Sequence, residues 1–443
     1  MELRREDMRT ACGSGGLKDG SVAEVAMVLT RAGLAGRSEV ELLSAFCEAC
    51  RREGLDLGRA VTFMGTLHPQ FEERVCRWDY RECVKAVSEY SADEGVFVEN
   101  WKDSALFHLM DTGKDEVRRR IGFGDSTDFY GLKSLRDAGH TDFIAFACRF
   151  GSEAVVGEIK CFYAYFTTVA AQGFSDDDIG ALKQLVLHLA LASRCATMDR
   201  VAKTVASVYL GDDVADQVFH GEIVRGRTTR MQAVVWFSDL SDFTRISDTS
   251  DPNEIIPLLN DYSEAVISSI LAAGGNVLKL IGDGTLAIFN APTASNACAA
   301  ALQAYGTLRK TIPSMNARRS IEGRPTTDVY VGLHVGEVFY GNIGSAARLD
   351  FTVVGRTVNE ASRIVGLCHA LSTDILMSSI FAQSLDATKR TLAASVGCHS
   401  LRGVSKSMEL YSLKNQAQLS AAFSDRGACH VVASEVPGLQ SRI

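Results

Sequence analysis

The chain has 443 residues, of which 46% are hydrophobic and 23% charged, and a formal net charge of -8. Its length predicts two or three domains, and its composition is that of a packed globular protein. The negative charge argues against binding of nucleic acid through its phosphates. No apolar run approaches the ~20 residues of a membrane span, and no apolar segment follows the charged N-terminus as in a secretory signal. We therefore expect a cytoplasmic protein with no membrane span and no nucleic-acid partner.

The first part of the chain mixes helical and strand-like patterns. Residues 1–20 are polar and rich in glycine, which predicts disorder. Apolar residues then recur with helical spacing in 21–35 and 38–53. Strand-like patterns and short amphipathic helices follow, the strands at 60–67, 95–99, 142–149 and 155–166 and the helices near 106–110 and 130–138.

Twelve cysteines are scattered along the chain, which is typical of small buried residues and not of a disulfide framework. Cys47 and Cys50 form a CxxC pair within the helical pattern of 38–53. No second CxxC follows at the interval of a zinc site. Whether this pair binds metal or responds to redox conditions stays open.

A long helix is predicted from about residue 174. Ser175 and Asp178 have the spacing of a capping box, and no glycine or proline occurs from 181 to 210. Two apolar stripes are out of phase across 197–200, namely Leu182, Leu185, Leu189 and Ala192, then Val201, Val205 and Val208. A helix buried in its own domain explains the first stripe, whereas a parallel dimer helix explains both stripes and the joint between them. We favour the dimer interpretation and treat 196–230 as a helical linker.

Strands and helices alternate in residues 231–413, and 414–443 is a polar segment that we expect to be a flexible tail. Three motifs stand out in this second part. The first is AVVWFSDLSDFTRIS, where Asp239 ends a buried strand just before a helix begins. A carboxylate there can bind a hard cation beside backbone N–H groups that face phosphate oxygens. Taken alone, an aspartate at a strand end is more often a turn residue.

The second motif is the hairpin of two short strands around Gly282-Asp283-Gly284. Lys279 precedes Asp283 by four residues and shares a strand face with it if no bulge intervenes. A lysine on a strand of Val, Leu and Ile lies either at a sheet edge or in a pocket. The third motif is RLDFTVVGRTVNEASRI, which places Asn359 and Arg363 on one helix face. Thr352 lies seven residues before Asn359.

Together, FSDLSDFT, KLIGDG and TVVGRTVNEASR resemble the class III adenylyl cyclases of the bacterial soluble type, over residues 231–413. The segment GLHVGEVFYGNIGS resembles the same family. The resemblance implies an α/β fold of the α+β kind, in which a ferredoxin-like catalytic domain follows a GAF-like α/β sensor domain and the helical linker. The sensor domain would span 21–195, with aromatic residues such as Phe97, Trp101 and Phe146 as a possible ligand pocket or plain core. Its ligand is not identified.

The resemblance also implies the roles of individual residues. Asp239 and Asp283 would bind two Mg²⁺ or Mn²⁺ ions per site, with the Leu240 carbonyl as a further ligand. The remaining roles are purine reading by Lys279 and Thr352, transition-state contacts by Asn359 and Arg363, and triphosphate binding by Phe243, Thr244 and either Arg402 or Lys406. Two positions depart from the family, because Asp242 stands where relatives usually have glycine and Arg356 where many have Asp or Asn.

The implied reaction converts ATP to 3′,5′-cyclic AMP and pyrophosphate. The Lys279 ammonium can donate to adenine N1, which guanine does not offer as an acceptor, so ATP is favoured over GTP. In the family each site lies between two catalytic domains, and this chain has one such domain with a complete set of residues. A homodimer with shared active sites is therefore expected. The alternatives are a guanylyl cyclase and a catalytically weak nucleotide-binding regulator.

Overall fold

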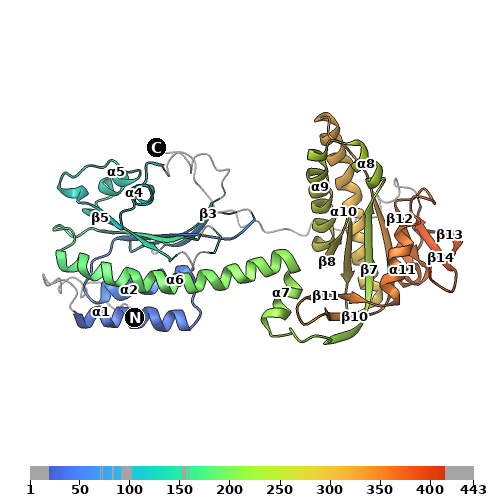
Figure 1. Ribbon diagram of the computed structural model, residues 1–443, viewed down its shortest axis with the longest axis horizontal. Helices are drawn as coiled ribbons and strands as arrows, with labels where there is room; N and C mark the ends of the chain where they lie inside the picture. The colour runs from blue at the N-terminus through green and yellow to red at the C-terminus, as the bar shows by residue number, and fades with distance from the viewer. Residues whose placement is uncertain are drawn as a thin grey trace, which may run out of the picture. The chain divides into compact units, whose positions relative to one another are not determined.

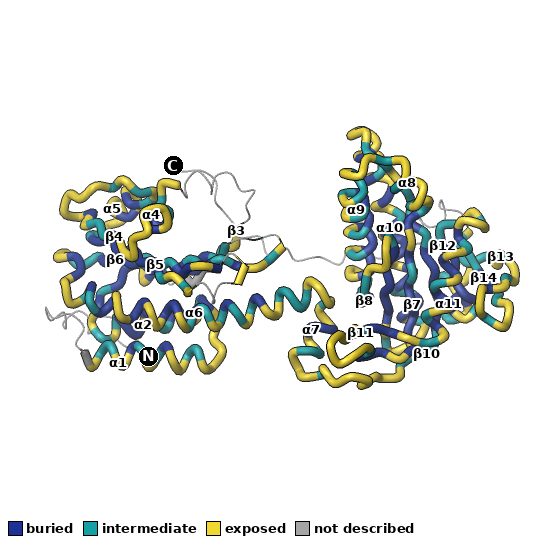
Figure 2. Tube along the Cα trace, viewed as in Figure 1, coloured by how far each residue is buried: buried dark blue, intermediate teal, exposed yellow. Residues whose placement is uncertain are grey.

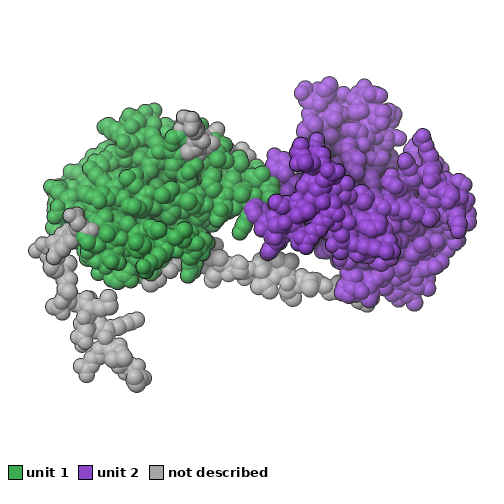
Figure 3. All heavy atoms as spheres, turned by 60° about the horizontal axis from the view of Figure 1, so that its bottom comes forward, with its two compact units in different colours: residues 1–206 green, residues 207–443 purple. Residues whose placement is uncertain are grey.

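The computed structural model describes residues 19–69, 71, 73–81, 84–90, 102–151, 156–157 and 159–414. The chain divides into two compact units, residues 1–206 and 207–443, which are coloured separately in Figure 3. Disorder was predicted for residues 1–20, of which 1–18 lie outside the described residues, as do the strand at 95–99 with Phe97, Trp101 and the tail at 415–443. Asp19 and Gly20 instead belong to a helix. Among the described helices, none has the length and apolar character that a membrane crossing requires.

The first unit is built on a six-stranded antiparallel sheet in the order β3-β2-β1-β6-β5-β4. Its strands are β1 (Arg59–Gly65), β2 (Glu73–Asp79), β3 (Val84–Tyr90), β4 (Glu116–Arg119), β5 (Asp142–Arg149) and β6 (Cys161–Thr168). The pattern at 142–149 coincides with β5, whereas the strand expected from 155 begins only at Cys161. Strands β2, β3 and β4 were not predicted, because charged residues interrupt their apolar alternation.

Helices cover both faces of this sheet, as Figure 1 shows. One face carries α1 (Asp19–Leu34), α2 (Glu39–Arg52) and α6 (Asp176–Leu210), and the other carries α4 (Ala105–Thr112), the 3-10 turn η1 (Ile121–Phe123) and α5 (Leu132–Asp137). Side chains alternate between the two faces of each strand. In β6, for example, Phe162, Ala164 and Phe166 enter the core beneath α2 and α6. The buried positions in Figure 2 therefore lie on both sides of the sheet.

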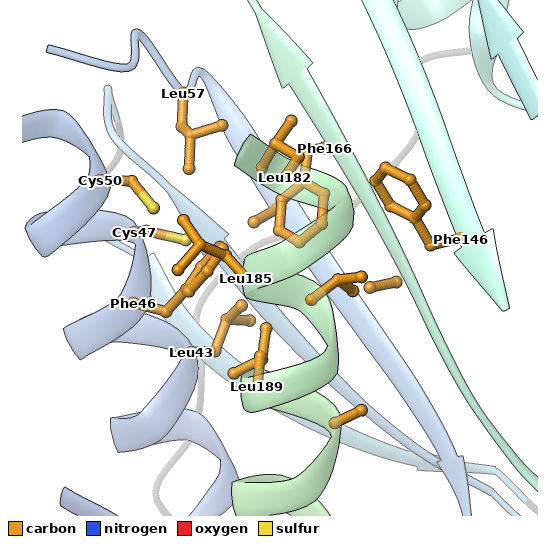
Figure 4. Packing of buried hydrophobic residues seen from close by; sticks show 14 of the residues in the cluster. Leu43, Phe46, Cys47, Cys50, Leu57, Phe146, Phe166, Leu182, Leu185 and Leu189 are labelled. Atoms are coloured by element: carbon orange, nitrogen blue, oxygen red, sulfur yellow. The ribbon is translucent and has the colours of Figure 1, made fainter. Parts of the chain in front are cut away.

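Helix α6 uses its first apolar stripe to close this core. Leu182, Leu185 and Leu189 are each 0% exposed and point toward Phe46 and Phe166 (Figure 4). The dimer interpretation of this stripe is therefore wrong, because the residues are buried in their own unit. Cys47 and Cys50 belong to the same core, where burial raises the pKa of both thiols. They pack as small apolar residues.

The joint predicted at 197–200 is the place where polar side chains hold α6. Glu39, at the start of α2, accepts a hydrogen bond from the Thr197 hydroxyl at 3.1 Å and from Arg200 Nε at 2.9 Å. A second nitrogen of Arg200 donates to the hydroxyl of Thr66 at 2.8 Å. These contacts explain why the apolar pattern is interrupted there, since buried charges must be paired.

The second unit contains an eight-stranded sheet with the path β13-β14-β12-β10-β7-β9-β8, and β11 pairs with β10 outside this path. Its strands are β7 (Thr228–Leu240), β8 (Asn276–Ile281), β9 (Gly284–Phe289), β10 (Val329–Gly344), β11 (Leu349–Val354), β12 (Ile375–Ser378), β13 (Ala393–His399) and β14 (Met408–Leu413). The central order β10-β7-β9-β8, with helices between β7 and β8 and between β9 and β10, is the predicted ferredoxin-like arrangement.

Helices α9 (Pro252–Ala272), α10 (Ala294–Ile321) and α12 (Ser379–Ser384) cover one face of this sheet. Helix α11 (Arg356–Val365) packs on the opposite face, against β10 and β7. Successive side chains of β7 point to opposite faces of the sheet. Trp236 packs on the side of α9, α10 and α12, and Val235 packs on the side of α11. The shorter helices are α7 (Asp212–Phe219), α8 (Phe243–Thr249) and α13 (Ala387–Arg390).

Candidate active site

Two carboxylates meet where β7 ends beside the hairpin of β8 and β9. Ser238 of β7 pairs with Thr285 of β9, so the next residue along β7, Asp239, lies beside the hairpin tip that carries Asp283. The backbone N–H of Leu240 donates to Asp283 Oδ2 at 3.2 Å. Gly284 permits this approach, because a Cβ there would lie 2.5 Å from the Ser238 carbonyl oxygen.

The two carboxylates disturb each other electrostatically. Burial and the nearby charge of Asp283 raise the pKa of Asp239 to about 6. A divalent cation between them would relieve this repulsion, and carboxylate oxygens are the donors that Mg²⁺ prefers. Among the described residues, no group of three or more His, Cys, Asp or Glu could hold a metal ion. The pair therefore fits an ion that keeps several waters and takes few protein ligands.

An open cleft of about 650 Å³ extends from the acid pair along α8. Of the predicted residues, it is lined by Asp239, Leu240, Asp242, Phe243, Thr244 and Asp283. Sequence reasoning missed Arg245, Asp248, Thr249, Tyr330, Val365, Gly366 and His369, which also line it. Tyr330 lies opposite Asp239 on β10, which the pairing of the folded strands shows and the sequence does not. His369 follows α11 in the chain and had no recognisable signal.

Asp242 occupies a position that glycine would fill without strain. Its φ of 54° lies in the left-handed region, which costs a residue with a Cβ about 1–2 kcal/mol. Its carboxylate lies 3.6 Å from Arg245 and 3.7 Å from His369 Nε2. Both partners line the same cleft. The added negative charge thus has one cation, Arg245, as a close neighbour.

Lys279 and Thr352 come from neighbouring strands outside this cleft. Lys279 lies on β8, the edge strand of the sheet, and forms an ion pair with Asp350 of β11. The bulge in β8 lies before Lys279, but the strand ends at Ile281 and Asp283 lies in the following turn, so the strand face predicted for Lys279 and Asp283 does not reach Asp283. Thr352 is only 5% exposed, and its hydroxyl has no hydrogen-bond partner among the described residues. A buried hydroxyl without a partner is a candidate ligand contact.

The basic and amide candidates lie apart from the cleft as well. Asn359 and Arg363 project from the exposed face of α11, and neither side chain has a partner within the described part of the chain. Arg402 and Lys406 are exposed in the segment between β13 and β14. None of these four residues lines the cleft. One copy of the chain therefore brings the acid pair together with Leu240, Phe243 and Thr244, but not with the other predicted contacts.

Comparison with known proteins places this geometry in a family context. Residues 227–415 match the family described as the adenylate and guanylate cyclase catalytic domain. The chain is 29% identical over 252 residues to the adenylate cyclase of Anabaena cylindrica, which covers 54% of this chain and 48% of that protein. It is 29% identical over 190 residues to adenylate cyclase 1 of Rhizobium meliloti, with 42% of this chain and 28% of that protein covered.

Among solved structures, the adenylyl cyclase CyaB from P. aeruginosa is 26% identical, with a TM-score of 0.39 and coverage of 43% of this chain and 96% of that one. The guanylyl cyclase Cya2 is also 26% identical, with a TM-score of 0.37 and coverage of 42% and 93%. The chain spans about half or less of the length of the two curated relatives above. The match over 227–415, together with the ferredoxin-like strand order, shows that the second unit contains a catalytic domain of the adenylate and guanylate cyclase family.

Proposed function

We propose that the chain is an adenylate cyclase, which converts ATP to 3′,5′-cyclic AMP and pyrophosphate. The observation that carries the proposal is the Asp239–Asp283 pair, which lies at the head of a cleft in a domain of the cyclase family. The reaction is an in-line displacement at the α-phosphorus by the ribose 3′-hydroxyl. Such a reaction depends mainly on positioning and on charge stabilisation.

Asp239 and Asp283 would hold two Mg²⁺ or Mn²⁺ ions. When bound, such ions lower the pKa of the attacking hydroxyl and neutralise charge on the phosphates. Phe243 and Thr244 lie at the start of α8, where the chain leaves the acid pair, and line the cleft that would receive the triphosphate. Arg363 would contact the phosphates through its planar guanidinium, and Asn359 would orient the ribose.

Adenine would be read by Lys279 and Thr352. The hydroxyl of Thr352 is buried without a partner and can accept from the exocyclic amine of adenine. The ammonium of Lys279, on the adjacent strand, can donate to adenine N1. Guanine offers a protonated N1, which cannot accept from Lys279, so its binding would leave two donors facing each other, whereas the Thr352 hydroxyl can also donate to the guanine carbonyl.

The active site would be shared between two copies of the chain. In support, the cleft of one copy contains the acid pair but neither the purine contacts nor Asn359 and Arg363. A second copy would supply them across the interface, and a C2 dimer would give two equivalent sites.

Helix α6 offers a surface for this dimer on a face that its own unit covers only in part, since Met198 and Val205 pack against the core edge and the other residues of that face are exposed. Six residues of α6 form this face and recur with alternating spacings of four and three residues. They are Leu191, Cys195, Met198, Ala202, Val205 and Tyr209. We call them the α6 seam. Leu191 is 61% exposed and Tyr209 is 81% exposed. This spacing is that of a parallel coiled coil.

The first unit would act as a sensor for the catalytic domain. Its antiparallel sheet with helices on both faces is compatible with the GAF-like domain expected from the sequence. Helix α6 starts in the core of this unit and continues without interruption to Leu210. A ligand that shifts α6 would thus alter the geometry of the dimer. The ligand itself stays unidentified.

The direct test uses purified protein with Mn²⁺ and either ATP or GTP. We expect cyclic AMP from ATP, and much less cyclic GMP from GTP. Chelation of the metal should abolish the activity, and Asp283→Asn should do so at any ATP concentration. No product from ATP would refute the proposed reaction, and equal product from GTP would refute the base preference.

A second test addresses the shared site. Asp239→Ala and Arg363→Ala subunits are each expected to be inactive as homodimers. Their heterodimer, purified through two different tags, contains one intact site and should recover part of the activity. No recovery in a proven heterodimer would contradict the shared site.

A further inference from the structure

We infer that the buried pair His334–Glu360 positions Asn359 and Arg363 for catalysis by fixing helix α11 on the sheet. The inference rests on the proposed function, because it takes Asn359 and Arg363 as transition-state contacts. His334 lies in the middle of β10 and Glu360 on α11, and they are 3% and 5% exposed. Both are buried polar residues that the proposed reaction does not use directly.

A continuous chain of hydrogen bonds runs through this pair. His334 Nε2 lies 3.0 Å from Glu360 Oε2, and His334 Nδ1 lies 2.8 Å from the hydroxyl of Ser378. Ser378 in turn accepts from the backbone N–H of Phe381 at 3.2 Å and so caps α12. The other oxygen of Glu360 accepts from Arg356 Nε at 2.7 Å. The pair therefore connects α11 with the end of β12 and the start of α12.

The protonation state of His334 follows from these partners. A carboxylate only accepts, so Nε2 carries the hydrogen that is donated to Glu360. Nδ1 then accepts from the Ser378 hydroxyl, whose oxygen is already occupied by the Phe381 N–H. Burial lowers the pKa of His334 although the charge of Glu360 opposes this shift. Neutral imidazole thus satisfies each of its partners at neutral pH.

The strand beneath α11 is shaped for a close approach of the helix. Gly332 and Gly336 flank His334 on the same face of β10. A Cβ at Gly332 would lie 2.7 Å from the backbone nitrogen of Val365, and one at Gly336 would lie 2.6 Å from the Thr357 hydroxyl. Two glycines therefore let α11 lie directly on β10, and the histidine between them reaches the one buried carboxylate of the helix.

The position of Glu360 in α11 links this contact to the candidate catalytic side chains. Glu360 follows Asn359 directly and precedes Arg363 by three residues, so a rotation or slide of the helix at Glu360 moves both. Apolar contacts of Ala361 and Ile364 hold the helix on the sheet but do not fix its rotation, because they are not directional. Two hydrogen bonds supply direction: the Thr357 hydroxyl donates to the Glu337 carbonyl at 2.7 Å in the first turn of α11, and Glu360 accepts from His334 at 3.0 Å one turn later, between Asn359 and Arg363.

The heterodimer of Asp239→Ala and Arg363→Ala subunits separates positioning from general stability. Its single intact site uses α11 of the Asp239→Ala subunit, whereas α11 of the Arg363→Ala subunit is idle. Glu360→Leu placed in the first subunit should lower the recovered kcat roughly tenfold to a hundredfold, as misplacement of catalytic groups does. The same substitution in the second subunit should leave the recovered activity close to that of the parent heterodimer. The two heterodimers carry the same three substitutions and differ only in which subunit contains Glu360→Leu. A merely structural role of Glu360 therefore predicts the same loss of activity in both.

Glu360→Gln provides the conservative control. Its amide oxygen still accepts from His334 Nε2, so most of the activity should return in the first subunit. Circular dichroism of each homodimer checks that the variants fold. Equal loss in both arrangements, or no loss in either, would overturn the inference. An inactive parent heterodimer or an inactive wild type would instead refute the proposed function.

Discussion

Lys279 of β8 is held by an ion pair with Asp350 of β11, two residues before the buried hydroxyl of Thr352. The ion pair thus holds the Lys279 cation against the strand that carries the unpaired hydroxyl, and Lys279 and Thr352 are the pair proposed to read adenine. The sequence left open whether Lys279 lies at a sheet edge or in a pocket. Lys279 lies on β8, the edge strand, where Asp350 is its partner.

Asp350→Asn should weaken base discrimination. Without the carboxylate, the Lys279 side chain loses the contact that orients it toward Thr352. The pair is partly exposed, so solvent screening limits the effect to about three- to tenfold in the ratio of kcat/KM for ATP over GTP. Glu409→Gln, which removes another half-exposed carboxylate from the same unit, is the matched control. A ratio unchanged by Asp350→Asn would show that the ion pair does not orient the lysine.

Replacement of Asp242 should separate charge from backbone strain. Asp242→Gly and Asp242→Ala both remove a carboxylate from the cleft, so both should lower the KM for ATP through reduced repulsion of the triphosphate. Only glycine accepts the φ of 54° without strain, whereas alanine keeps a Cβ and loses the local interactions of aspartate. Asp242→Ala should therefore be less stable than Asp242→Gly by about 1 kcal/mol. Steady-state kinetics and thermal unfolding measure the two effects, and a higher KM in both variants would show that Asp242 assists binding.

The contact between Glu39 and Arg200 should make the stability of the first unit depend on pH. Burial tends to raise the pKa of Glu39, but its hydrogen bonds and Arg200 outweigh this effect, so the pKa lies below the ordinary value of 4.5. A carboxylate with a lowered pKa contributes stability that is present above the unfolded pKa and is lost as pH falls through the folded pKa. Glu39→Gln should lower the free energy of unfolding by about 1–3 kcal/mol at pH 7.

The difference between wild type and Glu39→Gln should shrink below pH 4.5, because the wild-type carboxylate is then increasingly protonated. Urea unfolding of the full chain at several pH values, followed by circular dichroism, measures it. Glu53→Gln at the opposite end of α2 is the control, and it should leave the pH profile unchanged. A difference for Glu39→Gln that is constant down to pH 3 would contradict the role assigned to the charge.

Local patterns predicted where Asp239 and Asp283 lie, whereas their role as a metal-binding pair was predicted from the family resemblance. Asp239 follows a run of buried strand residues and Asp283 occupies a hairpin tip, and both features depend on neighbours in the chain. Tyr330 and His369 could not be predicted from local patterns. Tyr330 reaches the cleft only through the pairing of β10 with β7, and His369 only through the turn after α11. The purine and transition-state residues were predicted from motif resemblance alone. Their assembly with the acid pair requires a second copy and is still a prediction.

The apolar stripes of α6 show a different limit. Leu182, Leu185 and Leu189 have the spacing of a dimer seam, but a sheet and a partner helix require the same periodicity. Only the fold reveals that a sheet occupies this face. Likewise, β2 was missed because charged residues such as Glu73 and Arg77 interrupt its apolar pattern. Periodicity finds an apolar face, but it does not identify what covers that face.

The α6 seam can be tested through its own cysteine. In a parallel dimer in register, Cys195 of one subunit lies opposite Cys195 of the other, within the short Cβ separation that a disulfide requires. Among the described residues, Cys195 and Cys398 are the exposed free cysteines. Mild oxidation should therefore give a covalent dimer on non-reducing gels that Cys195→Ser abolishes and Cys398→Ser leaves intact. Leu191→Asp should weaken the non-covalent dimer, because each chain would place a charge in the seam at a side chain that is 61% exposed in its own unit. A protein that is dimeric by light scattering, forms no cross-link and tolerates Leu191→Asp must dimerise through another surface, because a parallel seam would bring both residues to the two-fold axis.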